Sequence, residues 1–262
     1  MPSTSWGYRA VVRLGAALAP ALGLMDRKMG DGHRQRRGAA DRLSAWAADA
    51  RDVARPLAWF HAASVGEGLQ AESVLLELRR LMPDCQLVYT HFSPSAEPLA
   101  RRLTVDVADY LPYDLPQAAD QLLAALAPDL LVFAKLDLWP ELATRSAARG
   151  ATVALVAATV SAGSGRLRWP ARALLRPGYA AVSAAGAVAQ PDAGRLARLG
   201  VPAGRIRVLG DPRFDSVAAR VTAVPRDEPL LRFGLGAPTL VAGSTWPPDE
   251  DVLLEAFARV RA

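Results

Sequence analysis

A chain of 262 residues, of which 51% are hydrophobic, is long enough to bury a core and too apolar to be disordered. The net charge of +5 is modest and comes from arginines spread along the chain, without the aromatic-interleaved basic stretches that nucleic-acid binding needs, so we expect no nucleic-acid partner. The single cysteine, Cys85, excludes an internal disulfide and a cysteine-based metal cluster, which fits the cytoplasmic side of a cell.

The N-terminal residues 1–40 differ in character from the rest. The segment from Ala10 to Met25 is almost wholly apolar, interrupted by Arg13 and Pro20, and basic residues follow it. It is shorter than the ~20 residues of a spanning helix, and no small-residue cleavage site marks a signal peptide. We expect residues 1–40 to associate with an anionic membrane surface. The alternative is a core helix that packs on the domain.

Apolar, strand-like runs alternate with helical patterns along the chain. The strands are expected at residues 57–61, 86–90, 130–134, 153–157, 206–209 and 239–242. Asp114 and Pro116 begin one helix, Trp139-Pro140 begins another, and Pro191-Asp192 begins a third. Such alternation is typical of parallel strands joined by right-handed crossovers. The predicted fold class is therefore α/β, with a doubly wound parallel sheet.

The run from His61 to Glu67 stands where a strand ends and a helix begins. It follows the apolar residues 57–60 and precedes residues 69–82, in which apolar side chains recur at helical spacing. Ligands of open parallel sheets bind at this kind of edge. Glu67, in a turn of small residues, is a natural general base. Alone, it is also compatible with an ordinary first-turn glutamate.

A domain boundary is expected near residues 221–238, which are rich in proline, glycine and charge. It separates a Rossmann-like domain at residues 41–222 from a linker with one further strand and one helix at residues 223–262. One strand and one helix are too little for a domain. Either these elements complete the first domain or a second domain has been cut off, and we expect the latter, with ~150 further residues beyond residue 262.

Four segments, in order, resemble the 3-deoxy-D-manno-octulosonic acid (Kdo) transferases of lipopolysaccharide biosynthesis. The most specific is His61-Ala-Ala-Ser-Val-Gly-Glu67, which is close to the signature of that family. The others are Leu138-Trp139-Pro140, Gly210-Asp-Pro-Arg-Phe-Asp215 and Gly243-Ser-Thr245. The resemblance runs from about Trp59 to the end of the chain.

The resemblance implies a two-lobed glycosyltransferase of the GT-B type whose second lobe is largely missing here. The N-terminal lobe would hold a lipid A-type acceptor, and the C-terminal lobe a CMP-Kdo-like nucleotide sugar, at the cytoplasmic face of the inner membrane. No metal and no cofactor are implied. The implied site residues are Glu67 as catalytic base, Ser64, Gly66, Lys135 and Asp137 on the acceptor side, and Arg213, Ser244 and Thr245 on the donor side.

Among the positions that depart from the pattern of the family, three bear most on activity. Lys135 replaces the first of two acidic residues before Leu-Trp-Pro, Thr159 replaces an arginine, and Trp246 replaces a histidine. Two other functions therefore stay open: a relative that binds a sugar or lipid without transferring Kdo, and a transferase that uses another nucleotide sugar, such as a UDP sugar. His61 is expected to orient a neighbouring residue by a hydrogen bond rather than to react itself.

Overall fold

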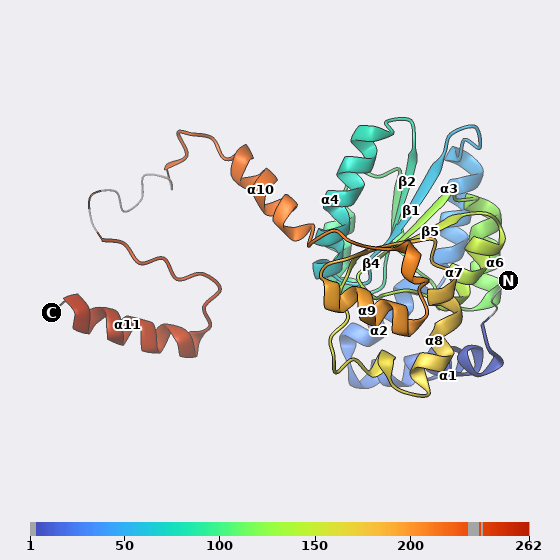
Figure 1. Ribbon diagram of the computed structural model, residues 1–262, viewed down its shortest axis with the longest axis horizontal. Helices are drawn as coiled ribbons and strands as arrows, with labels where there is room; N and C mark the ends of the chain where they lie inside the picture. Colours follow the sequence, from blue (N-terminus) through green and yellow to red (C-terminus); the bar gives the residue numbers. More distant parts are fainter. Residues whose placement is uncertain (1–3, 230–235, 237, 262) are drawn as a thin grey trace. The chain divides into compact units, whose positions relative to one another are not determined.

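A seven-stranded parallel β-sheet forms the centre of the first of two compact units in this computed structural model (Figure 1). The structure describes residues 4–229, 236 and 238–261. Its contacts divide the chain into a first unit, residues 1–219, and a second unit, residues 220–262.

The strands lie in the order β3-β2-β1-β4-β5-β6-β7. Their bounds are β1 Leu57–His61, β2 Gln86–His91, β3 Val107–Tyr110, β4 Leu130–Ala134, β5 Thr152–Ala158, β6 Ala184–Ala187 and β7 Ile206–Val208. The chain builds outward from β1 through β2 to β3, then returns to add β4 on the other side of β1. The direction of winding therefore reverses between β1 and β4, and the predicted doubly wound sheet is confirmed.

Helices cover both faces of this sheet. Their bounds in the first unit are α1 Trp6–Met25, α2 Arg27–Arg36, α3 Ala39–Ala50, α4 Val65–Leu81, α5 Glu97–Ala100, α6 Pro116–Leu126, α7 Pro140–Ala148, α8 Ala171–Ala180 and α9 Gln190–Leu199. Successive strand residues point to opposite faces. Trp59 and Phe133 pack with α3, α6 and α7, whereas Phe60 and Val132 pack with α4 and α5. Burial on both faces explains the continuous apolar runs.

The five strands predicted within the first unit are confirmed to within one residue at each end. Two strands, β3 and β6, were missed. Their sequences, Val-Ala-Asp-Tyr and Ala-Ala-Gly-Ala, lack the runs of large apolar residues that mark the others. Strand β3 pairs with β2, and β6 pairs with β5 and β7. These neighbouring strands supply hydrogen-bond partners, so both segments form strands despite their weak hydrophobic pattern.

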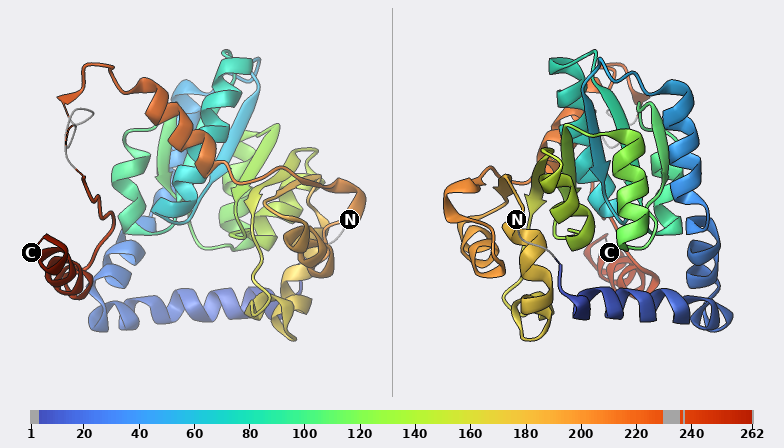
Figure 2. Two further views of the ribbon diagram at one scale, coloured as in Figure 1. Left: turned by 60° about the vertical axis from the view of Figure 1, so that its left-hand side comes forward. Right: turned by 90° about the vertical axis from the view of Figure 1, so that its right-hand side faces the viewer.

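Helix α1 lies on the outside of the first unit, beside α2 and α8 (Figure 2). The expectation that this segment is too short to span a membrane was wrong, since the helix begins at Trp6 and its 20 residues are long and apolar enough by length and composition. The alternative, a core helix that packs on the domain, is confirmed only in its packing: α1 contacts α2 and α8, but 6% of its apolar window is buried, so it is not a core helix.

The second unit holds the end of α10, Arg213–Ala223, and the helix α11, Pro247–Arg261. The predicted helix at residues 249–260 is confirmed by α11. The predicted strand at residues 239–242 is wrong: these residues form no strand. A strand needs a neighbour for its backbone groups, and the described residues of this unit contain none. Residues 230–235 and 237 of the predicted linker lie outside the described residues.

Candidate functional site

The candidate site lies at the carboxyl ends of β1 and β4, where the winding of the sheet reverses. His61 and Phe133 are register partners at the ends of these two strands. The segment that follows β1 carries the sequence from Ala62 to Glu67, and the segment that follows β4 carries the sequence from Lys135 to Trp139. Two of the motifs singled out from the sequence therefore lie at the point where open α/β sheets bind their ligands.

Glu67 is the third residue of α4 and completes a capping box at its N-terminus. One carboxylate oxygen, Oε2, accepts hydrogen bonds from the backbone N–H of Ser64 at 3.1 Å and from its hydroxyl at 2.9 Å. Both bonds fix the carboxylate at the start of the helix, where the dipole favours a negative charge. Gly66 in the same turn is exposed and has open space where a side chain would stand. Glu67 is half-buried, and its other oxygen receives no hydrogen bond from the described part of the chain.

Asp137 is held by two donors from opposite sides. His61 Nε2 lies 3.1 Å from Asp137 Oδ2, and the Trp139 indole donates to the same oxygen at 3.2 Å. Burial alone would raise the pKa of Asp137, but the bond and charge of His61, the bond from Trp139 and the charge of Arg166 outweigh it and lower the pKa below its usual value. The carboxylate therefore stays ionised within the site.

The His61 ring is fully buried and its second nitrogen, Nδ1, lies 3.0 Å from the Thr90 hydroxyl. The buried Trp59 indole donates to that same hydroxyl oxygen at 2.8 Å. Because the ionised carboxylate of Asp137 can only accept a hydrogen bond, His61 donates to it from Nε2. His61 thus orients Asp137, which is the role expected from the sequence.

The Gly210–Asp215 segment runs beside the helix that carries Glu67. Gln70 on α4 donates to Asp211 at 3.2 Å, and Ser73, one turn later, donates to the carbonyl of Pro212 at 3.1 Å. Arg213 donates to Asp211 from Nε and Nη2 at 2.8 and 2.6 Å. The Arg213 bonds lower the pKa of Asp211 to about 2. The predicted donor-side cation is therefore already paired with an internal carboxylate.

Lys135 follows β4 directly and has a left-handed backbone, with φ of 60°. Its N–H donates to the carbonyl of Val156 at 2.7 Å, and Ala157 on β5 is also left-handed, with φ of 52°. Such conformations are costly for residues with a Cβ and are concentrated at functional sites. The Lys135 side chain is exposed and forms no ion pair with the described residues.

Ser244 and Thr245 belong to the second unit, just before α11. Thr245 donates from its hydroxyl to Glu250 at 2.8 Å, and Ser244 has a left-handed backbone with φ of 59°. Trp246 donates its N–H to Asp249 at 3.0 Å. The loop thus caps the helix locally, and the donor-binding role of Ser244 and Thr245 stays a prediction.

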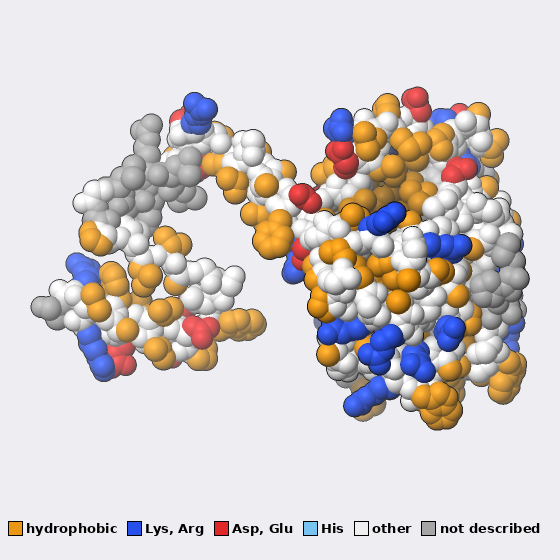
Figure 3. All heavy atoms as spheres, viewed as in Figure 1, with side chains coloured by type: hydrophobic (Ala, Val, Ile, Leu, Met, Phe, Trp, Pro, Cys, Tyr) orange, Lys and Arg blue, Asp and Glu red, His pale blue; other side chains and the backbone are white. Residues whose placement is uncertain are grey.

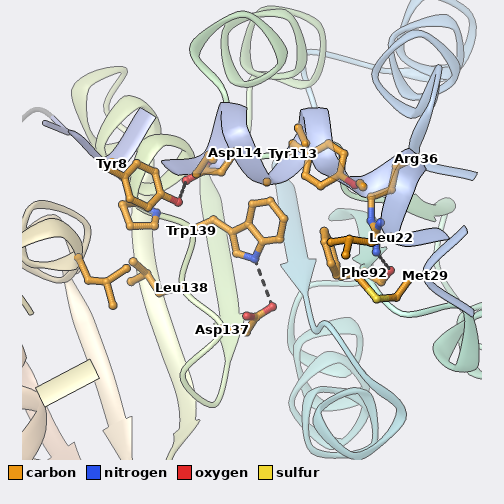
Figure 4. A pocket seen from close by; sticks show the side chains of 16 residues that line it. Tyr8, Leu22, Met29, Arg36, Phe92, Tyr113, Asp114, Asp137, Leu138 and Trp139 are labelled. Carbon is orange, nitrogen blue, oxygen red and sulfur yellow. Dashed lines mark hydrogen bonds between the residues drawn. The ribbon is translucent and has the colours of Figure 1, made fainter. Parts of the chain in front are cut away.

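A cavity of about 500 Å³ adjoins Asp137 and Trp139 (Figure 4). One side is the inner face of α1, and the other is the set of loops after β2, β3 and β4. The sequence predicted Asp137 at this place but not the other polar residues of the lining. Those residues are Tyr8, Arg36, Tyr113 and Asp114.

Asp114 has a different role from the one expected. It does not cap α6; its oxygens accept the N–H groups of Glu141 and Leu142 at 2.7 and 2.9 Å, at the start of α7. Its third donor is the hydroxyl of Tyr8 on α1, at 2.7 Å. Burial raises the pKa of Asp114 to about 6. Together with bonds from Arg9 to the buried Glu141, these contacts fix α1 on the first unit.

The described residues contain no group of three or more histidine, cysteine or acidic side chains that could hold a metal ion.

Residues 32–216 match the family model of the 3-deoxy-D-manno-octulosonic-acid transferases (Kdo transferases). Curated relatives with that name include one from Haemophilus influenzae, 24% identical over 209 residues, and one from Bordetella pertussis, 30% identical over 219 residues. Each match covers 78% of this chain and 48% of the relative. The chain therefore spans about half the length of the curated relatives it matches.

Among solved structures, one that matches is a Listeria monocytogenes protein assigned as a UDP-N-acetylglucosamine 2-epimerase. The TM-score is 0.50 at 12% identity, over 68% of this chain and 50% of that protein. At this identity the likeness concerns the fold alone, which is the GT-B-like arrangement expected from the sequence.

Proposed function

This chain belongs to the Kdo transferase family, and we propose that it forms the acceptor-side half of an enzyme that transfers Kdo from CMP-Kdo to a lipid A precursor. The observation that carries the proposal is the match over residues 32–216 together with Glu67 in the family's signature, at the switch point of the sheet. Ligands of such sheets bind at this point.

In the proposed reaction, Glu67 is the general base. A hydroxyl of the acceptor attacks the anomeric carbon of Kdo, the new C–O bond forms as the bond to CMP breaks, and Glu67 takes the hydroxyl proton. The capping bonds from Ser64 occupy Oε2 and leave Oε1 for that proton. Ser64 and Gly66 shape the turn, because the first anchors the carboxylate and the second leaves open space beside it.

Asp137 and Lys135 are the proposed acceptor-side partners. Asp137 is ionised, held by His61, and borders the cavity under α1, so it is suited to accept a hydrogen bond from a sugar hydroxyl. Lys135 is an exposed cation with no carboxylate partner in the described structure, and it is suited to bind an acceptor phosphate.

Arg213, Ser244 and Thr245 are the proposed donor-side residues. Arg213 is paired with Asp211, so a donor phosphate would share or displace that carboxylate. Ser244 and Thr245 precede α11, and the start of a helix offers backbone N–H groups to a phosphate.

We place the proposed reaction at the cytoplasmic face of the inner membrane. Helix α1 exposes Trp6, Leu14, Leu18 and Leu24. Residues 158–209 contain eight arginines and Asp192 as their one acidic residue. Figure 3 shows Lys and Arg side chains gathered on the part of the first unit that carries α8 and α9. An apolar helix beside arginines suits an anionic leaflet.

The proposal is tested with the purified full-length protein, CMP-Kdo and a lipid A precursor, with the mass of the lipid product as the measurement. Addition of one or more Kdo units supports the proposal. If the protein transfers sugar from a UDP sugar and not from CMP-Kdo, the donor is a UDP sugar. Acceptor binding without any transfer would support the second candidate below.

The second candidate is a relative of the family that binds the acceptor without transferring Kdo, or that has another specificity. It is favoured by Lys135, which reverses a charge at the end of β4, and by Thr159 and Trp246, which replace polar residues of the family pattern.

A further inference from the structure

Arg36, the last residue of α2, lies with its guanidinium flat against an aromatic wall of the cavity. Its Cζ is 3.3 Å from the ring centroid of Phe92 and 5.5 Å from that of Tyr113. Its Nη2 donates to the carbonyl of Phe92 at 2.7 Å. Figure 4 shows the side chain at one end of the cavity, beside Leu22 and Met29. Stacking of this kind orients a guanidinium for a ligand.

Within the described part of the chain, no carboxylate pairs with the Arg36 guanidinium. Arg36 forms no ion pair with the described residues, and its Nε is buried without a hydrogen-bond partner. Burial is the main cause that lowers its pKa, and the neighbouring Tyr113 opposes it. An unpaired, partly buried charge is costly to a folded protein unless an anion binds to it.

Neither of the two acidic residues that border the same cavity pairs with the Arg36 guanidinium. Asp114 accepts three hydrogen bonds, from Tyr8, Glu141 and Leu142. Asp137 is satisfied by His61 and Trp139. Both carboxylates lie away from Arg36 along the cavity (Figure 4).

The rest of the cavity is suited to an alkyl chain. Its long wall is the inner face of α1, formed by Val12, Ala16, Ala19 and Leu22. At Gly15, in the same wall, an added Cβ would have no atom within 4 Å. A volume of about 500 Å³ is within the range of cavities that hold small ligands.

We infer that this cavity binds a phosphorylated amphiphile, with its alkyl chain along the inner face of α1 and its phosphate on Arg36. The inference deepens the proposed function, on which it rests for the identity of the biological ligand as the lipid acceptor. Arg36 would then select acceptors that carry a phosphate near an acyl chain.

Binding is measured by calorimetry with this chain and dodecyl phosphate below its micelle concentration. Dodecyl maltoside, which has the chain without the charge, and inorganic phosphate, which has the charge without the chain, are the comparison probes. We expect dodecyl phosphate to bind at least about tenfold more tightly than either, as a charged hydrogen bond and chain burial together predict.

Two pairs of variants locate the site. Arg36→Gln should weaken dodecyl phosphate binding about tenfold or more and leave dodecyl maltoside unchanged, whereas Arg37→Gln, at the exposed neighbour, should change neither. Gly15→Leu should weaken both amphiphiles by filling the cavity, whereas Ala17→Leu, on the exposed face of α1, should not.

Equal effects of Arg36→Gln and Arg37→Gln, or equal affinity for the charged and neutral amphiphiles, would overturn the inference. If inorganic phosphate bound as tightly as dodecyl phosphate, the alkyl chain would have no role in binding. These results are independent of Kdo transfer, so a failure of the proposed function and a failure of this inference give different outcomes.

Discussion

His61 Nε2 lies 3.1 Å from Asp137 Oδ2, and this bond joins the carboxyl ends of β1 and β4. It links the signature that begins at His61 to the Leu-Trp-Pro motif that begins at Leu138. His61 and Leu138 are 77 residues apart in the chain. A sheet whose winding reverses between these two strands makes the contact possible. The two motifs therefore belong to one hydrogen-bonded network.

Thr90→Val should destabilise the first unit by about 2–3 kcal/mol. The change keeps the shape of the side chain but removes the hydroxyl between the Trp59 indole and His61 Nδ1, leaving two buried polar groups unpaired. Urea unfolding measures the effect. Thr152→Val, at an exposed position of β5, is the control and should change stability by less than about 0.5 kcal/mol.

Asp114→Asn should remove a dependence of stability on pH between about 4 and 6. The folded protein holds the proton of Asp114 more tightly than the unfolded chain, because burial raises its pKa to about 6. The contribution of this group is therefore fully present below pH 4 and is lost as the pH rises through 6. At about 1.4 kcal/mol per pKa unit, the loss amounts to at most about 3 kcal/mol.

Unfolding by urea at pH 4.5 and pH 7, for the native and the Asp114→Asn proteins, measures this linkage. The native protein should lose more stability than the variant on going to pH 7. An equal pH dependence of the two proteins would show that Asp114 titrates at its ordinary pKa.

Gly68→Ala should destabilise the first unit despite the higher helix propensity of alanine. A Cβ at Gly68 would stand 2.4 Å from Leu99 Cδ2 and 2.7 Å from the buried Tyr89 hydroxyl. We expect a net loss of about 1–2 kcal/mol, since crowding outweighs a helix gain of about 1 kcal/mol. Thermal unfolding is the measurement. Gly194→Ala on α9, which has open space, should instead be stabilising.

The sequence predicted the parallel sheet because β1, β2 and β4 are buried on both faces along nearly their whole length and are therefore rich in apolar residues. It missed β6, whose residues Ala184–Ala187 are too small to mark a strand by hydrophobicity and which exists because β5 and β7 flank it. It placed a strand at residues 239–242 for the opposite reason: the residues are apolar, but no described neighbour pairs with them.

The site could be predicted in part. Glu67 was predicted as a base from its place after a strand, and the structure shows it in a capping box with Ser64, while its catalytic role stays a prediction. Arg36 and Asp114 could not be found, because their roles come from contacts with residues far away in the chain. Asp114 precedes Pro116 and so resembles a cap for α6, whereas it binds the start of α7. Long-range pairs of this kind leave no local pattern.

The proposed role of Glu67 as the base of Kdo transfer is tested by the transfer rate of Glu67→Gln in the full-length protein. Glutamine can still accept the capping bonds of Ser64 but cannot take a proton. Glu72→Gln, on the same helix, is the control. With CMP-Kdo and a lipid A precursor, we expect Glu67→Gln to lower the rate by about 10²-fold or more at unchanged thermal stability, and Glu72→Gln to leave it unaltered. Transfer by Glu67→Gln at the native rate would show that Glu67 is not the base.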